Sequence, residues 1–157
     1  MNATSSSKPV SLEQDAQLLG ALLALMSREQ AHLVKADVDA IEAALEEKSI
    51  LLQRLNLAAR ARYDALLTNG FEASEAGMDA WVQRQAKPSI SQSWAKFQKA
   101  LSEAKEMNRL NGVLISKHFN RNQELLNHLQ GNSSVDSVYG RDGQAKSQAP
   151  TRSGLIV

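Results

Sequence analysis

The chain has 157 residues, of which 43% are hydrophobic and only 4% aromatic, and 18 basic and 17 acidic residues leave a net charge of +1. The apolar residues are mostly Leu and Ala, with few β-branched ones, a composition that favours helices over sheets. The near-neutral charge argues against binding to nucleic acid, and the absence of cysteine excludes disulfides and thiolate metal sites. The polar N-terminus and the lack of a long apolar run predict a cytoplasmic protein without direct membrane insertion.

Two amphipathic helices are predicted in the first half of the chain, after a polar lead at residues 1–10 that is expected to be disordered. After Ser11, apolar residues recur at steps of three, four and seven, which predicts a helix over about 11–35. The members of this apolar face are Leu12, Leu19, Leu22, Met26 and Leu33. Asp37 is a suitable N-cap for a second helix, which runs to about residue 67 and ends near Gly70. The predicted buried face of the second helix consists of Val38, Ile41, Leu45, Lys48, Leu52, Leu55, Ala59, Arg62 and Leu66.

Two charged residues lie at matching depth on the apolar faces of these helices. Because the break near residues 36–37 is short, the helices are expected to fold back as an antiparallel hairpin, in which positions whose numbers sum to about 73–77 face each other. Glu29 and Lys48 satisfy this rule. They are predicted to pair, since an unpaired charge on an apolar face is costly. The pair would fix the register of the hairpin more than it would add stability.

Glu29 also begins an E-x-x-H sequence with His32, a spacing that di-iron bundles use in pairs. The chain contains no second copy, so the structural pair is the preferred interpretation, and no metal or cofactor is predicted. Nothing in the sequence resembles a nucleophile elbow or a glycine-rich phosphate loop. We therefore expect a protein that is not an enzyme.

A short connector helix is predicted between residues 71 and 88. Ser74 is a suitable cap for it, and Met78, Trp81 and Val82 fall on one side. Pro88 ends the connector, because the residue before a proline avoids the α region.

One long helix is predicted to follow, opened by a capping box of Ser89 and Gln92 and ended by Gly131. Its face repeats at steps of three and four throughout. The members of that face are Trp94, Phe97, Leu101, Ala104, Asn108, Asn111, Ile115, His118, Asn122, Leu125 and Leu129. Residues 132–157 are rich in Ser, Gly and Gln and are predicted to form a flexible tail.

The centre and far end of this long helix carry the features that bear most on function. Asn111-Gly112 is a common hairpin turn, but the pattern is unbroken on both sides, so the helix is predicted to continue through it. The last apolar residues lie beyond the reach of the first two helices and are predicted to be exposed: Ile115, Phe119, Leu125, Leu126 and Leu129. Such a patch indicates either a surface for a partner or a face covered by a second copy of the chain. The pattern leaves both interpretations open.

These elements predict an all-α fold, in which an antiparallel helical hairpin and a long C-terminal helix form an elongated, coiled-coil-like bundle. The helical domain is expected to span residues 11–131, between the lead at 1–10 and the tail at 132–157. If the exposed face is closed by further copies, the protein is instead a structural coiled-coil subunit of an obligate homo-oligomer.

Three segments resemble the FlgN family of flagellar export chaperones: "LVKADVDAIEAALEEKSILLQRL", "NGVLI" in the middle of the long helix, and "VYGRDGQ" after it. The resemblance covers about residues 12–144. It implies a cytoplasmic, non-enzymatic chaperone of the flagellar type III export system. Such proteins bind the C-terminal helices of the hook-filament junction proteins FlgK and FlgL, prevent their premature assembly, and deliver them to the export gate protein FlhA.

The resemblance also assigns roles to residues. Asn111, Gly112, Leu114 and Ile115 match an "NG-LI" element, and Tyr139 with Gly140 matches a tyrosine-glycine element that the family links to gate docking. Gly112 would let a partner helix approach the backbone closely. The residues predicted to bind partners are Asn111, Gly112, Ile115, His118, Phe119, Asn122, Leu125, Leu126, Leu129 and Tyr139. Weak self-association through the same face is compatible with this role.

Overall fold

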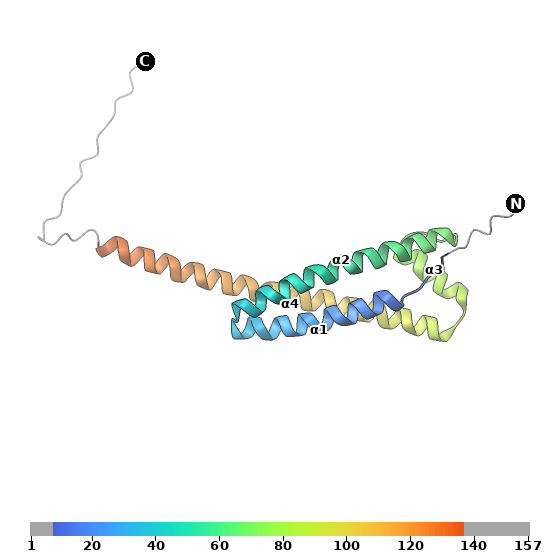
Figure 1. The fold of residues 1–157 in the computed structure, drawn as a ribbon, viewed down its shortest axis with the longest axis horizontal. Coiled ribbons are helices and arrows are strands. Elements are labelled where there is room, and N and C mark those ends of the chain that lie inside the picture. Colours follow the sequence, from blue (N-terminus) through green and yellow to red (C-terminus); the bar gives the residue numbers. More distant parts are fainter. Residues whose placement is uncertain (1–7, 137–157) are drawn as a thin grey trace, which may run out of the picture. The chain divides into compact units, whose positions relative to one another are not determined.

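The computed structural model describes residues 8–136 and contains four helices in that range (Figure 1). They are α1 (Glu13–Lys35), α2 (Val38–Thr68), α3 (Glu75–Gln85) and α4 (Pro88–Asp136). The described part of the chain contains no strand, so the predicted all-α fold is confirmed. The chain divides into two compact units, residues 1–116 and residues 117–157, and the boundary falls within α4.

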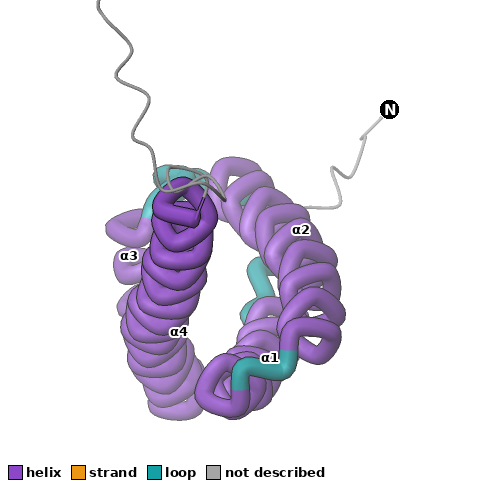
Figure 2. The backbone as a smooth tube through the Cα atoms, turned by 90° about the vertical axis from the view of Figure 1, so that its left-hand side faces the viewer, coloured by secondary structure: helices purple, strands orange, loops and turns teal. Residues whose placement is uncertain are grey.

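The hairpin of α1 and α2 forms because the sequence specifies both its turn and its register. Asp37 caps α2 as predicted, its Oδ1 accepting a hydrogen bond from the backbone N–H of Ala40 at 3.2 Å. Ala36 turns the chain with a φ of 55° (Figure 2). At the far end, α2 stops before Gly70, whose φ of 83° matches its predicted role after the helix. Cα atoms of α1 and α2 approach within 8 Å of each other, so these two helices pack closely.

The buried face of α1 follows the prediction, but that of α2 differs. Leu19, Leu22, Met26 and Leu33 of α1 are buried. On α2 the row packed into the core is Ala44, Leu51, Ala58 and Ala65, joined by Arg62 and Leu66. The predicted members Val38, Leu45 and Leu52 are exposed, so that part of the prediction is wrong. α2 carries two neighbouring apolar rows, and the row richer in alanine packs into the core because small side chains let two helices approach closely.

The cap predicted for the connector helix is present, whereas the capping box predicted for the start of α4 is not. Ser74 caps α3, its Oγ accepting a hydrogen bond from the N–H of Gly77 at 3.0 Å. A Cβ on Gly77 would lie 1.8 Å from the carbonyl oxygen of Glu72, so this turn requires glycine. The capping box of Ser89 and Gln92 does not form, because α4 already begins at Pro88. A proline suits the first position of a helix, where its fixed φ is helical and its missing N–H is not needed.

α4 continues without interruption through Asn111-Gly112, which confirms that prediction. It ends at Asp136, later than the predicted end at Gly131, so the helix takes in the first residues assigned to the tail. The rest of the predicted tail, with Tyr139, and residues 1–7 of the lead lie outside the described residues.

The first part of α4 contributes the aromatic residues of the core. Trp94 and Phe97 are buried, and their stacked rings lie 5.8 Å apart between centroids. They pack in one cluster with Leu22 and Met26 of α1 and Leu66 of α2. This cluster joins α4 to both helices of the hairpin.

Candidate functional site

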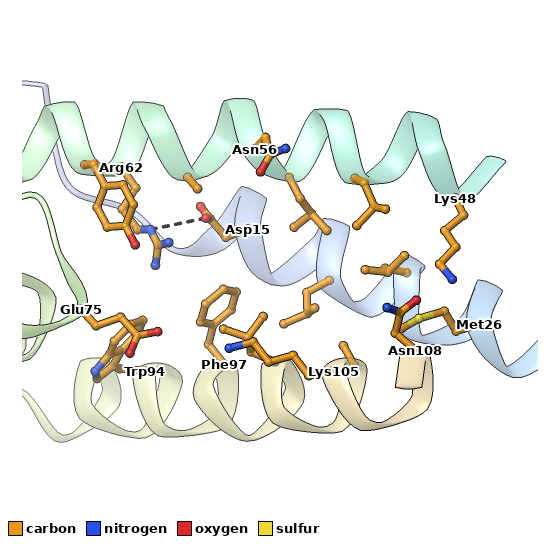
Figure 3. Close-up of a pocket in the computed structure, with 18 residues that line it drawn as sticks. Asp15, Met26, Lys48, Asn56, Arg62, Glu75, Trp94, Phe97, Lys105 and Asn108 are labelled. Carbon is orange, nitrogen blue, oxygen red and sulfur yellow. Dashed lines mark ion pairs between the residues drawn. The ribbon is translucent and has the colours of Figure 1, made fainter. Parts of the chain in front are cut away.

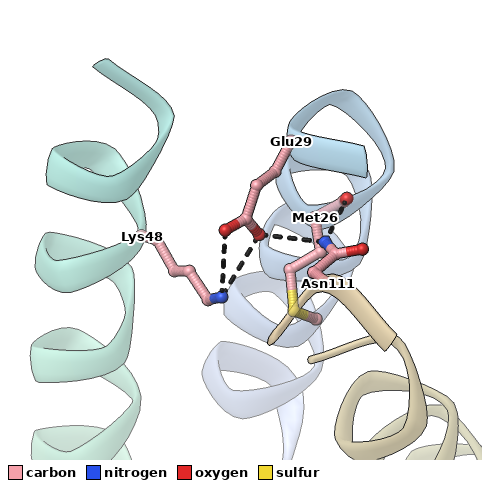
Figure 4. Close-up of polar contacts among 4 residues, drawn as sticks. All are labelled: Met26, Glu29, Lys48 and Asn111. Carbon is pink, nitrogen blue, oxygen red and sulfur yellow. Dashed lines mark hydrogen bonds and ion pairs between the residues drawn. The ribbon is translucent and has the colours of Figure 1, made fainter. Parts of the chain in front are cut away.

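The predicted pair of Glu29 and Lys48 is present and has a third member (Figure 4). Lys48 Nζ lies 3.4 and 3.2 Å from the two carboxylate oxygens of Glu29. Asn111 of α4 donates from Nδ2 to Glu29 Oε2 at 3.0 Å and to the carbonyl oxygen of Met26 at 2.9 Å. Glu29 and Asn111 are both fully buried. Three helices therefore meet at one polar cluster, and Glu29 has two partners without any role for His32.

This cluster explains why α4 carries an asparagine on an apolar face. A buried carboxylate needs several donors to replace water. Lys48 and the Asn111 amide supply them from opposite sides. Asn111 was predicted to contact a partner, but its side chain faces Glu29 in the interior. We therefore treat it as a residue that sets the register of α4 against the hairpin.

A second buried ion pair, which the sequence reasoning missed, joins Asp15 of α1 to Arg62 of α2. Their Oδ1 and Nε atoms lie 3.4 Å apart, and both residues are more than nine-tenths buried. Burial raises the pKa of Asp15, and the nearby Arg62 charge opposes that rise. The sequence contains a pattern that predicts this pair. Asp15 stands three residues after Leu12 and four before Leu19, and positions 15 and 62 obey the same pairing rule as positions 29 and 48.

Three aromatic rings surround the Arg62 guanidinium. Its Cζ lies 5.2 Å from the ring centroid of Tyr63, 5.3 Å from that of Phe97 and 5.8 Å from that of Trp94. Such contacts stabilise a cation that has lost its water. Nevertheless, Nε and Nη1 of Arg62 have no hydrogen-bond partner among the described residues.

A cavity of about 350 Å³ lies between α2 and the first part of α4 (Figure 3). Side chains of α2 and α4 point into it from opposite sides, and α1 lies behind (Figure 3). Its lining from α2 includes Lys48, Leu52, Leu55, Ala59 and Arg62, and that from α4 includes Trp94, Phe97, Leu101, Ala104 and Lys105. The wall from α2 is thus the apolar row that sequence reasoning had assigned to the packed core.

The second unit presents a different surface, which we call the C-terminal face and define as Phe119, Leu125, Leu126 and Leu129. These side chains are 67, 55, 53 and 66% exposed. At 3.6 residues per turn they fall within an arc of roughly 120° of the helix. Their predicted exposure is confirmed.

The other predicted contact residues vary in burial. In the first unit Ile115 is 37% exposed, and Gly112 is exposed with open space where a Cβ would stand. In the second unit His118 is half-buried and Asn122 is exposed. Three of these four positions are therefore exposed, and His118 is the more enclosed one.

These features define an all-α bundle with two apolar surfaces that no other described part of the same unit covers. Residues 10–147 match the family model described as FlgN protein. The chain is also 30% identical over 110 residues to the flagella synthesis protein FlgN of Proteus mirabilis, which covers 70% of this chain and 68% of that protein. No solved structure matches. The chain belongs to the FlgN family, and its function is related to the flagellum.

No helix within residues 8–136 is both long enough and apolar enough to cross a lipid bilayer. Likewise, no group of three or more acidic or histidine side chains in that range is arranged to hold a metal ion.

Proposed function

We propose that this protein is a cytoplasmic export chaperone that binds the C-terminal helices of FlgK and FlgL, prevents their premature assembly and delivers them to the export gate protein FlhA. Membership of the FlgN family supports this proposal. The observation that carries it is the C-terminal face, where four large apolar side chains of one helix are more than half exposed. Large apolar patches on a small protein are commonly binding surfaces.

The spacing of the C-terminal face suits a helical client. Phe119 and Leu126 stand seven residues apart, and Leu125 and Leu129 four apart, which are the separations of successive anchors in helix–helix recognition. Asn122 lies among them and is exposed. A polar residue within an apolar seam lowers the affinity of that seam for other apolar helices and limits self-association. An export chaperone needs a moderate affinity for its client because it must release that client.

The same face also favours the alternative of a structural coiled-coil subunit, in which a second copy of the chain covers Phe119 and its neighbours. The two functions differ in the oligomeric state of the free protein. An export chaperone is a monomer, or a weak dimer that the client peptide dissociates. A structural subunit is an oligomer that the peptide does not change. Light scattering on size-exclusion fractions, with and without peptide, distinguishes them.

The direct test replaces Phe119 and Leu126 together with Ser and titrates the variant calorimetrically with a peptide from the C-terminal helix of FlgK or FlgL. The melting temperature should stay nearly unchanged, because little apolar surface is buried at either site, and binding should be lost. A matched control replaces Leu57 and Leu67, which are 65% and 58% exposed on α2. That variant should bind normally. If the Phe119 and Leu126 variant binds like wild type, the C-terminal face is not the client site.

Gate docking is assigned to Tyr139, which lies outside the described residues. We expect Tyr139→Ala to leave client binding intact and to weaken a pull-down with FlhA. Equal loss of both interactions would place Tyr139 in the client site instead.

A further inference from the structure

The cavity between α2 and α4 has apolar walls on both sides that nothing in the described part of the first unit covers. α2 places Leu52 and Leu55 there, beside the row that packs into the core. Leu52 is 45% exposed. Leu101 of α4 stands on the opposite wall. In four-helix bundles a fourth helix covers two neighbouring helices in this way. A volume of about 350 Å³ accommodates a few side chains from one face of such a helix.

Arg62 supplies an independent observation, because it is buried, lines this cavity and is incompletely bonded. A guanidinium has five N–H donors and favours bidentate pairing with a carboxylate. Asp15 lies 3.4 Å from Nε, but neither Nε nor Nη1 has a hydrogen-bond partner among the described residues. Leaving such donors unmet in a buried site is costly. The chemistry of the site therefore calls for a further acceptor beside the aromatic rings.

The other charges that line the cavity balance once their ion pairs are counted, so the unmet donors of Arg62 are the feature that favours a carboxylate. Lys48 and Lys105 add positive charge to that of Arg62, whereas the carboxylates are Asp15 and Glu75. Lys48 already pairs with Glu29, and Asp15 with Arg62. Lys105 is exposed, and its side chain lies on the α4 side of the cavity (Figure 3). Glu75 is the carboxylate that would compete with an incoming one.

We infer that this cavity is a second docking site, which takes an amphipathic helix of a partner protein with one carboxylate among the apolar residues of its buried face. The apolar side chains would rest on Leu52, Leu55 and Leu101, and the carboxylate would accept hydrogen bonds from Arg62. This site lies in the first unit and shares no residue with the C-terminal face, so it goes beyond the client surface proposed above.

The test uses the full chain and two synthetic amphipathic helices of roughly 18 residues, a length at which an isolated helix is still marginal and binding can order it. The peptides are identical except for one Glu or Gln at the centre of the apolar face. Wild type should bind the Glu peptide about tenfold more tightly than the Gln peptide, as charge-assisted hydrogen bonds are the stronger kind. Calorimetry measures affinity, and Trp94 fluorescence reports whether the cavity is occupied.

Three variants test which site is responsible for the preference for the Glu peptide. Arg62→Gln should remove the preference for Glu, and the Phe119 and Leu126 double variant should keep it, which separates this site from the proposed client surface. Because Arg62 is buried and its variant can fail to fold, Lys105→Glu at the exposed rim provides a second test and should weaken the Glu peptide selectively.

Equal affinity of wild type for the two peptides, or no binding of either, would overturn the inference. It is also overturned if light scattering finds a dimer that the Glu peptide dissociates, because a second copy of the chain then occupies the cavity.

Discussion

The two parts of α4, before and after Ser116, follow one spacing rule and have opposite surroundings. In the first part Trp94, Phe97 and Asn111 are buried. In the second part Leu125 and Leu129 are more than half exposed. The comparison shows that periodicity identifies the residues that share a face, whereas their burial depends on whether another segment covers that face.

Polar residues in the same row also differ in what they do. Asn111 is enclosed and bonded to Glu29 and to the backbone of Met26. Asn122 is exposed. The first asparagine satisfies a buried charge, while the second is available to modulate a surface. One residue type in one heptad row therefore lies in two different environments.

The largest expected difference between the two parts is in stability. Trp94→Ala should lower the free energy of unfolding by about 3–5 kcal/mol, because it removes a large buried side chain. Trp94 also loses its hydrogen bond to Asp79 and its stacking on Phe97. Phe119→Ala, the matched change in the second part, should alter it by no more than about 0.5 kcal/mol. Urea unfolding of both variants measures this, and similar losses would mean that the C-terminal face is covered.

The polar cluster that holds the first part of α4 should give the next largest effect. Lys48→Met should cost about 3 kcal/mol, since it leaves a fully buried Glu29 without its cation. Adding Glu29→Leu should restore part of that loss, as the charge is then gone. A double-mutant cycle in urea measures the coupling. Strictly additive effects of the two substitutions would show that the pair does not interact in solution.

Gly112, near the boundary between the two parts, should give a smaller effect of opposite sign. Gly112→Ala should stabilise the protein by about 1 kcal/mol, because glycine is a poor helix former and nothing lies within 4 Å of the added Cβ. If a client helix approaches this backbone, the same change should weaken client binding. Gly20→Ala is the control, since Gly20 is equally unobstructed in α1. It should give the same gain in stability and leave binding unchanged.

The smallest effect concerns the pH dependence of the first unit. The folded-state pKa of Asp15 lies above its ordinary value of 3.8, mainly because of burial. The protonated form is therefore favoured on folding, so Asp15 contributes stability below pH 3.8 that is lost as the pH rises through the folded-state pKa. Relative to Asp15→Asn, wild type should gain stability as the pH is lowered toward 3.8. A difference that is constant with pH would contradict the predicted shift.

Much of the fold could be predicted from local signals. Asp37, Ser74 and Gly70 mark helix ends through chemistry that acts within a few residues. The length of the hairpin break also predicted that Glu29 meets Lys48. By contrast, the row of α2 that packs into the core could not be chosen from the pattern. Ala44 and Leu45 begin two equally regular rows, and close packing favoured the one with smaller residues.

Features of the candidate sites that depend on α4 alone could be predicted. Features that depend on how three or more helices pack together could not. The exposure of Phe119 and Leu126 followed from their positions along α4. The partner of Asn111 did not, because it lies 82 residues away in Glu29. The cavity beside Arg62 is lined by residues of all four helices, and no local pattern in the sequence shows how these come together.

The bonds of Asn111 have a consequence for the order of folding. Glu29 and Lys48 are 19 residues apart, so the hairpin closes through a short loop, whereas Asn111 bonds to Glu29 across 82 residues. Closing the longer loop costs more chain entropy, and contacts between distant parts of a chain form more slowly. We therefore expect the hairpin to be in register before α4 docks. Asn111 can complete its bonds only with a hairpin that has paired correctly. These late bonds therefore favour the docking of α4 on a hairpin in the correct register.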